Sequence, residues 1–399
     1  MRWQRFKIIA AVCVLFPLSL VLGGTAFHRP IITFFSGSES ATATQDSRAL
    51  PSPPQAIVAS TSEGQLYDPP RGDMRLVVIS DLNSAYGSTT YDPEVTKAIQ
   101  LMPFWQPDMV ICSGDMVAGQ KRTLSETQIQ AMWAAFDATL AKPLRDAQIP
   151  YGFTLGNHDA SSALGQNKTF VFAKERDLAA AYWQDPRHDP GINFIDRQDF
   201  PFYYTFQLDD IFFLAWDGSS DYIPPAKLAW VEQALASPDA QRAKLRILLG
   251  HLPLYGVAIG RDKPGEVMRN ADALRALLEK YDVHTYISGH QHAYYPGHRG
   301  ELQLLHTGNL GSGSRALIDG DFPPGKTLTV LDIFFDRPEK TVYTTYNMQT
   351  LEVIDHRQLP RFLLGHNGRV LRRDIEVSDL TPEEQVNCDR RLDRQRCQP

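Results

Sequence analysis

The stretch IPYGFTLGNHD, residues 149–159, joins a short apolar run to a group of polar residues. Four other stretches have the same form and end in an acid or a histidine: MRLVVISD (74–81), DMVICSGD (108–115), LRILLGH (245–251) and VHTYISGHQH (283–292). Apolar runs of this length are typical of buried β-strands. Because ligands gather at the carboxyl ends of strands in α/β sheets, we expect these five polar ends to converge on one site.

Stretches with helical composition lie between these runs. They cover residues 92–102, 124–145, 225–236 and 271–281. Strand-like runs dominate after residue 300. Alternating strands and helices followed by strands predict an α/β domain with two sheets face to face and helices outside. We place this domain at residues 74–350.

The polar strand ends offer a set of metal ligands made of two aspartates, one asparagine and three histidines. The set is Asp81, Asp115, Asn157, His251, His290 and His292. Mixed oxygen and nitrogen donors suit Mn, Fe or Zn, and no thiolate is needed. Two ions about 3.5–4 Å apart can share one carboxylate and one hydroxide, and the hydroxide then attacks phosphorus. A glycine beside each ligand allows a tight turn and a close approach of the backbone.

The order Asp, Gly-Asp, Gly-Asn-His-Asp, Gly-His and Gly-His-x-His resembles the calcineurin-like metallophosphoesterases over about residues 74–310. The resemblance implies a two-sheet β-sandwich flanked by helices in four layers. It also implies that His158 contacts the phosphoryl group, as a proton donor to the leaving oxygen or as a charge stabiliser. Asp159 would orient His158 by a hydrogen bond.

The same resemblance implies two metal ions that share one bridging carboxylate, that of Asp115. The first ion would be bound by Asp81, Asp115 and His292, and the second by Asp115, Asn157, His251 and His290.

The first motif departs from the family's pattern, which is Asp-x-His at this place. Asn83 stands in place of the histidine. Its amide oxygen can bind a metal, so Asn83 joins the candidate ligands, and the first site is expected to be weaker or to prefer Mn, Mg or Ca. The leading hypothesis is an exported metal-dependent phosphoric ester hydrolase acting on a phosphomonoester or a phosphodiester. The alternative is a non-catalytic binding protein of the same fold with one impaired metal site.

The N-terminus has the pattern of an export signal. Three basic residues precede an apolar run over residues 8–27, so residues 1–35 are predicted to be a signal peptide or a signal anchor. Both alternatives place the rest of the chain outside the cytoplasm, and an uncleaved run would tether it to a membrane. Residues 36–73 are rich in Ser, Thr, Ala and Pro and predict a flexible linker.

Residues 351–399 are more polar and are predicted to be a C-terminal extension, either a sheet edge or a tail. Cys388 and Cys397 within it could close a short loop outside the cytoplasm or remain free thiols. The chain carries 40 basic and 46 acidic residues, a net charge of −6, so no nucleic-acid partner is expected. The expected partner is a phosphorylated small molecule, on which Tyr86, Tyr182 or Trp183 could stack if they do not pack in the core. His306 is expected in the core.

Overall fold

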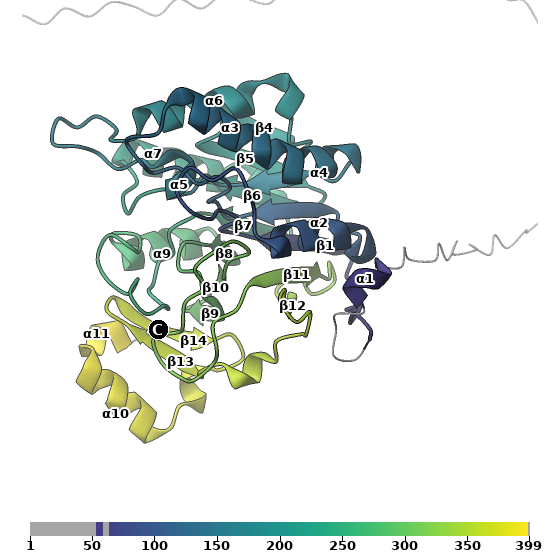
Figure 1. Cartoon of the computed structure of the whole chain (residues 1–399). Coiled ribbons are helices and arrows are strands. Elements are labelled where there is room, and N and C mark those ends of the chain that lie inside the picture. Colours follow the sequence, from purple (N-terminus) through teal and green to yellow (C-terminus); the bar gives the residue numbers. More distant parts are fainter. Residues whose placement is uncertain (1–52, 59–63, 398–399) are drawn as a thin grey trace, which may run out of the picture. The chain divides into compact units, whose positions relative to one another are not determined.

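The computed structural model describes residues 53–58 and 64–397 (Figure 1). The predicted signal or anchor, with its apolar run over residues 8–27, lies outside the described residues. Within the part of the chain that is described, no helix combines the length and apolar character needed to cross a membrane.

The smaller sheet has five strands in the order β12-β11-β1-β2-β3. Its bounds are β1 Met74–Ile79, β2 Met109–Cys112, β3 Tyr151–Phe153, β11 Thr327–Ile333 and β12 Val342–Asn347. The first three strands run parallel, and β11 and β12 are antiparallel additions. Every residue of β1 is buried, Arg75 included, because the strand lies between two neighbouring strands.

The larger sheet has nine strands in the order β13-β14-β9-β10-β8-β7-β6-β5-β4. Its bounds are β4 Asn193–Asp199, β5 Tyr203–Leu208, β6 Ile211–Ala215, β7 Leu245–Leu249, β8 Thr285–Ser288, β9 Tyr294–Arg299, β10 Leu302–Thr307, β13 Phe362–Gly365 and β14 Gly368–Arg372. The central strands β6, β7, β8 and β10 run parallel. Their carboxyl ends therefore lie at one edge of the sheet, where the predicted ligands follow β7 and β8.

The two sheets pack face to face through the ends of β3 and β5. The Tyr204 hydroxyl lies 3.2 Å from the Phe153 backbone nitrogen, and their rings are 5.7 Å apart between centroids. Just beyond β3, Thr154 Oγ1 donates a hydrogen bond of 2.8 Å to the Trp216 carbonyl. These buried contacts confirm the predicted sandwich of two sheets with helices outside.

Helices cover the sandwich, and α3 and α6 contact each other (Figure 1). Their bounds are α1 Gln55–Val58, α2 Pro93–Trp105, α3 Glu126–Phe136, α4 Lys142–Asp146, α5 Asn157–Ala160, α6 Ala173–Gln184, α7 Pro225–Leu235, α8 Pro238–Arg242, α9 Ala271–Lys280, α10 Pro382–Arg391 and α11 Arg394–Cys397. The helix predicted over 124–145 is α3 and α4 joined by a π-helical turn at Asp137–Ala141. It begins with a reciprocal cap in which the Ser125 hydroxyl accepts from the Gln128 N–H and the Gln128 side chain accepts from the Ser125 N–H.

The C-terminal extension completes the larger sheet. Strand β14 pairs with β9, and Leu371 lies opposite His298. All five residues of β14 are buried, so this part of residues 351–399 belongs to the sheet rather than to a solvated tail. Cys388 in α10 and Cys397 in α11 form a disulfide with Cα atoms 5.8 Å apart, which is the closed loop rather than the free thiols of the two alternatives that the sequence left open.

The linker predicted over residues 36–73 stays a prediction, and only residues 53–58 and 64–73 of it belong to the described part of the chain. Residues 64–73 pack on the domain: the Tyr346 hydroxyl donates a hydrogen bond of 2.7 Å to the Tyr67 carbonyl, and Leu66 is buried. Composition alone indicated flexibility, because isolated contacts with distant residues leave no periodic pattern in the sequence.

Candidate metal centre

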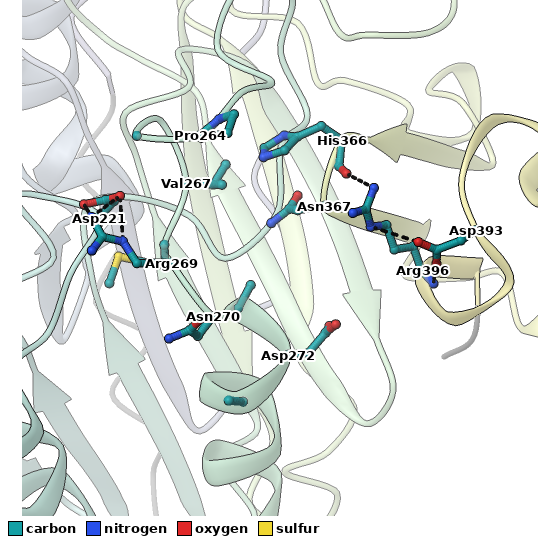
Figure 2. A pocket seen from close by; sticks show the side chains of 14 residues that line it. Asp221, Pro264, Val267, Arg269, Asn270, Asp272, His366, Asn367, Asp393 and Arg396 are labelled. Carbon is teal, nitrogen blue, oxygen red and sulfur yellow. Dashed lines mark hydrogen bonds and ion pairs between the residues drawn. The ribbon is translucent and has the colours of Figure 1, made fainter.

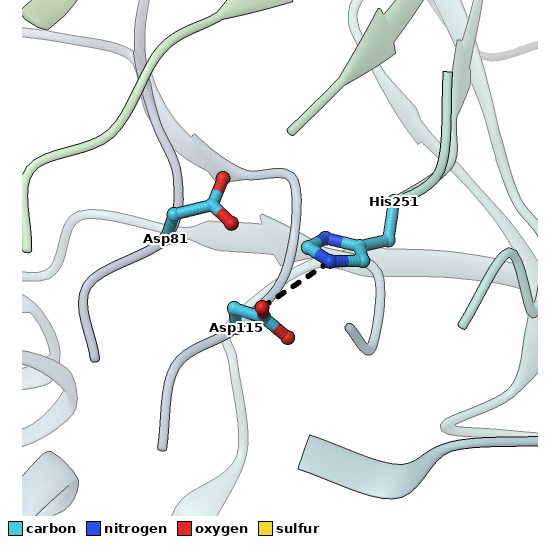
Figure 3. A group of neighbouring side chains, drawn as sticks. All are labelled: Asp81, Asp115 and His251. Atoms are coloured by element: carbon cyan, nitrogen blue, oxygen red, sulfur yellow. Dashed lines mark ion pairs between the residues drawn. The ribbon is translucent and has the colours of Figure 1, made fainter. Parts of the chain in front are cut away.

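The predicted ligands converge because they follow the parallel strands of both sheets. Asp81 and Asp115 follow β1 and β2 of the smaller sheet, and His251 follows β7 of the larger one. One ligand atom from each of these three buried side chains lies within 4.8 Å of the others (Figure 3). Two carboxylates and an imidazole at this spacing suit a borderline divalent ion, so the donors present fit the metal that the motifs predict.

Asn157 connects this group to a second histidine. It is the first residue of α5, directly after the Gly156 turn. Its Oδ1 lies 2.9 Å from His251 Nε2 and 2.9 Å from His290 Nδ1, while its Nδ2 donates to Gln120 Oε1. The amide oxygen therefore points at two imidazole nitrogens, which is the donor arrangement expected of a metal site.

His292 lies next to Asp81 at the candidate metal centre. Its Nε2 lies 3.1 Å from Asp81 Oδ1. Its Nδ1 lies 3.0 Å from the Gly313 carbonyl, which can only accept, so this nitrogen carries a proton and Nε2 is left for a ligand role.

The backbone at the ligands is held in an uncommon conformation. Asp81, Asp115, His290 and His292 all have positive φ, between 49° and 65°. Such angles cost a non-glycine residue of order 1–3 kcal/mol and cluster at functional sites. The neighbouring Gly156 leaves no room for a side chain, because a Cβ there would lie 2.1 Å from Asp115 Oδ1.

Opposite charges are buried next to each other at the centre. Burial by itself raises the pKa of the Asp115 carboxyl, but His251 and His158 outweigh it and hold this pKa below its usual range. Burial lowers the pKa of His251, but the Asp115 carboxylate, 3.3 Å away, raises it to about 9. The carboxylate and the imidazolium thus neutralise each other, and a bound metal ion would displace the proton.

His158 lies beside the ligands, but Asp159 does not orient it. The His158 Nδ1 lies 3.1 Å from the Gly119 carbonyl. Both Asp159 oxygens accept backbone N–H groups instead, from Val117 at 2.9 Å and from Gly156 at 2.8 Å. Among the described residues no hydrogen bond joins Asp159 to His158, and the Gly119 carbonyl is the partner of the His158 ring.

Asn83 is placed near the centre, but its contacts run through the backbone. Its N–H donates to the Asp115 carbonyl at 3.3 Å, and its own carbonyl accepts from the Ser312 N–H at 3.0 Å. Among the described residues no hydrogen bond joins its side chain to the candidate ligands. Its role as a ligand stays a prediction.

A cavity of about 340 Å³ adjoins the centre and contains groups that the sequence did not single out. Gln120, Arg261 and Glu266 line it together with His158 and His290. The hydrogen bond from His290 lowers the pKa of Glu266 to about 2, and burial lowers the pKa of His290 to about 3. The sequence around Arg261 and Glu266, RDKPGE, has no apolar periodicity and no motif that indicates a site.

The aromatic residues considered for stacking fall into two groups. Tyr86 is exposed, lines the cavity and lies 5.2 Å from the His158 ring. Tyr182 and Trp183 pack in the core, where Tyr182 stacks on Trp133 at 4.8 Å. Of the three, Tyr86 is the one that can meet a substrate.

Figure 2 shows a second, larger cavity of about 600 Å³. It shares Asp221 and Gly265 with the first cavity. Its charged lining is paired: Arg269 with Asp221 at 3.0 Å, and Arg396 with Asp393 at 3.5 Å. The C-terminal extension therefore forms one wall of the space next to the candidate metal centre.

The two-sheet sandwich and the carboxylates and imidazoles at its strand ends define a class of metal-dependent hydrolases. The sequence model of the calcineurin-like phosphoesterase family matches residues 74–294, and the chain belongs to this family. This family depends on dinuclear metal centres, and the candidate metal site of this chain contains Asp81, Asp115 and His251.

Solved structures give a further comparison. Purple acid phosphatase PPD1 from yellow lupin (Lupinus luteus) is 18% identical with a TM-score of 0.51; the match covers 72% of this chain and 54% of the lupin chain. This chain thus spans about half the length of the lupin protein, and the likeness shows the fold. GAP50, the anchor in the inner membrane complex of Plasmodium, is 14% identical with a TM-score of 0.43, over 70% and 86% of the two chains. A dimetal phosphatase from Danio rerio is 13% identical with a TM-score of 0.41, over 65% and 93%. The curated proteins include no match.

Proposed function

We propose that this protein hydrolyses a phosphomonoester or a phosphodiester with two metal ions, outside the cytoplasm. The observation that carries the proposal is the position of Asn157 Oδ1, 2.9 Å from nitrogens of both His251 and His290. The first ion would be held by Asp81, Asp115 and His292, and the second by Asp115, Asn157, His251 and His290. When bound, the ions would activate water for attack on phosphorus and neutralise charge on the phosphoryl oxygens.

His158 is proposed as the group that serves the leaving oxygen. A carbonyl can only accept a hydrogen bond, so the contact with Gly119 keeps the proton on Nδ1. This leaves Nε2, 3.9 Å from Asp115 Oδ2, to exchange a proton at the cavity or to stabilise charge there. Asp159 supports this geometry indirectly, since it ties the Gly156 turn to the Val117 backbone.

The substrate proposed is a phosphorylated small molecule. Beside the candidate ligands the cavity presents the hydroxyls of Ser161, Ser219 and Ser220 and the ring of Tyr86. Hydroxyls and an aromatic face suit a polar leaving group that carries little charge.

Export is supported by two features at opposite ends of the sequence. Basic residues precede the apolar run over residues 8–27. The Cys388–Cys397 disulfide is the kind of bond that persists in oxidising compartments. A tether through residues 8–27 would keep the enzyme at a membrane.

The test is hydrolysis of p-nitrophenyl phosphate and bis-p-nitrophenyl phosphate with Mn, Zn or Fe added to chelator-treated protein. We expect turnover with at least one metal, and the preferred substrate separates monoesterase from diesterase activity. Folded, metal-loaded protein without turnover on either compound would instead favour the non-catalytic binding protein.

A further inference from the structure

Gln291 stands between the two candidate ligands His290 and His292, and its side chain is fully buried. Its Oε1 accepts hydrogen bonds of 2.9 Å from the N–H groups of Val257 and Ala258. Its Nε2 donates to the carbonyls of Arg261 at 3.1 Å and Glu266 at 3.3 Å. All four bonds go to the backbone of one stretch, residues 257–266, which we call the clamped segment.

The clamped segment carries two charged side chains to the cavity. Glu266 Oε2 lies 2.8 Å from His290 Nε2. Arg261 Nη1 lies 3.2 Å from the same Glu266 oxygen and 2.8 Å from His290 Nε2. Both side chains line the cavity beside the candidate metal centre. Their positions depend on where the backbone of the clamped segment is held.

The Glu266 contact selects one nitrogen of His290. With Nδ1 bound to a metal ion, the ring proton would lie on Nε2, where the Glu266 carboxylate accepts it. Arg261 Nη1, which can only donate, would then bond to Glu266 rather than to Nε2. Nδ1 is the nitrogen that lies 2.9 Å from Asn157 Oδ1, on the side of the other ligands. A carboxylate behind a metal-binding histidine fixes its ring and increases its basicity.

Arg261 is the cation that the clamped segment brings to the cavity. The other charged side chains that line this cavity are the carboxylates of Asp221 and Glu266, and Asp221 is paired with Arg269. Arg261 can therefore hold an anionic oxygen of a phosphoester through its fork of N–H donors.

We propose that Gln291 is a positioning residue: it fastens the clamped segment so that Glu266 makes Nδ1 the metal-binding nitrogen of His290 and Arg261 binds the phosphoester anion. The inference rests on the proposed function. It concerns how the metal ligand His290 and the phosphoester substrate are positioned. The clamped segment is also joined to residues 316–318 by backbone hydrogen bonds, at 2.9 Å from Ile259 N–H to the Ala316 carbonyl and 2.9 Å from Ile318 N–H to the Val257 carbonyl. Loss of Gln291 should therefore shift the segment without unfolding the domain.

The first experiment measures Mn²⁺ binding to the chelator-treated chain by calorimetry, without substrate. Glu266→Ala should weaken one of the two Mn²⁺ sites by ~10–100-fold, and Glu266→Gln should restore most of this loss because its amide oxygen accepts the same N–H. Glu301→Ala, at an exposed carboxylate, is the matched control. Equal Mn²⁺ isotherms for wild type, Glu266→Ala and Glu266→Gln would overturn the assignment.

The second experiment separates metal binding from substrate binding. Arg261→Ala should raise KM for p-nitrophenyl phosphate by ~10-fold or more in protein whose metal sites are saturated, since a hydrogen bond to a charged group is lost. Arg187→Ala, an exposed arginine paired with Asp185, should leave KM unchanged. An unchanged KM in Arg261→Ala would contradict the anion-binding role.

The third experiment tests the clamp itself. Gln291→Glu keeps the acceptor for Val257 and Ala258 but cannot donate to Arg261 and Glu266, so it should combine the metal defect and the KM defect in one variant. Thermal unfolding of the metal-free chain reports whether this variant folds. A folded Gln291→Glu with wild-type Mn²⁺ binding and KM would overturn the proposal while leaving the proposed function intact. Wild type that binds no Mn²⁺ and shows no turnover with any metal would overturn both.

Discussion

His292 Nε2 lies 3.1 Å from Asp81 Oδ1 and thereby joins the end of β8 in the larger sheet to the end of β1 in the smaller one. Both residues adopt positive φ, so each strand ends in a tight turn that aims its side chain across the gap between the sheets. The candidate centre therefore exists only when the two sheets are packed together. Binding of metal ions to it should stabilise the sandwich as a whole.

Replacing the proposed bridging carboxylate tests the two-ion arrangement. Asp115→Asn should lose both ions, and the loss of turnover should exceed the ~10–100-fold typical of an outer-shell change. Metal content is read by elemental analysis after dialysis, with Asp336→Asn, an exposed aspartate, as the control. Near-normal content of both ions in Asp115→Asn would show that this carboxylate does not bridge them.

Asn83, which stands in place of the family's histidine, can be tested separately. Asn83→His restores the imidazole that the family pattern has, so it should raise affinity at the first site or change its preference among Mn, Mg, Ca and Zn. Competition titrations of wild type and variant provide the measurement. If affinity and preference stay the same, residue 83 lies outside the coordination sphere, in line with its backbone contacts.

His158 should matter most when the leaving group is a poor one. His158→Ala should lower kcat by ~10²–10⁴-fold for an alkyl phosphate, whose oxygen needs a proton, while metal content stays constant. p-Nitrophenolate leaves without a proton, so the loss with p-nitrophenyl phosphate should be much smaller. Equal losses for the two substrates would point to charge stabilisation instead of proton donation.

His306 predicts a dependence of stability on pH that does not involve the candidate centre. It is buried in β10, as expected, and neither ring nitrogen has a hydrogen-bond partner among the described residues. Burial lowers its pKa to about 3, below the ordinary value of 6.5. The unfolded chain therefore takes up the proton first, and stability falls as the pH drops from about 6.5 toward 3 by as much as ~1.4 kcal/mol per pH unit.

His306→Leu should remove this part of the acid sensitivity. Urea unfolding at pH 7.5 and pH 4.5 measures it, and the free energy of unfolding should fall less in the variant than in wild type. Parallel losses in the two proteins would show that His306 is not buried as a neutral ring.

The sequence predicted the centre because its signals are local. An apolar run that ends in Gly-Asp or Gly-His specifies a buried strand and its ligand together, and parallel strands must end at a common edge. The hydrogen bonds of Asp159 could not be predicted this way. His158 and Asp159 are adjacent in α5 and point in different directions, and their partners depend on how this helix packs. Arg261 and Glu266 were missed because their places depend on Gln291, far away in the sequence.

The same limit explains the edges of the domain. Strand β14 is recognisable only from its pairing with β9, and residues 64–73 are ordered by single contacts such as that of Tyr67 with Tyr346. Neither kind of long-range contact leaves a period in the sequence.

We propose that two metal ions bound between the sheets perform the chemistry. Elemental analysis of an active preparation, followed by chelation and stepwise return of metal during assay of p-nitrophenyl phosphate, tests it most directly. We expect two ions per chain, loss of turnover on chelation and recovery that follows the refilling of both sites. An active preparation that contains no metal and is unaffected by chelators would contradict it.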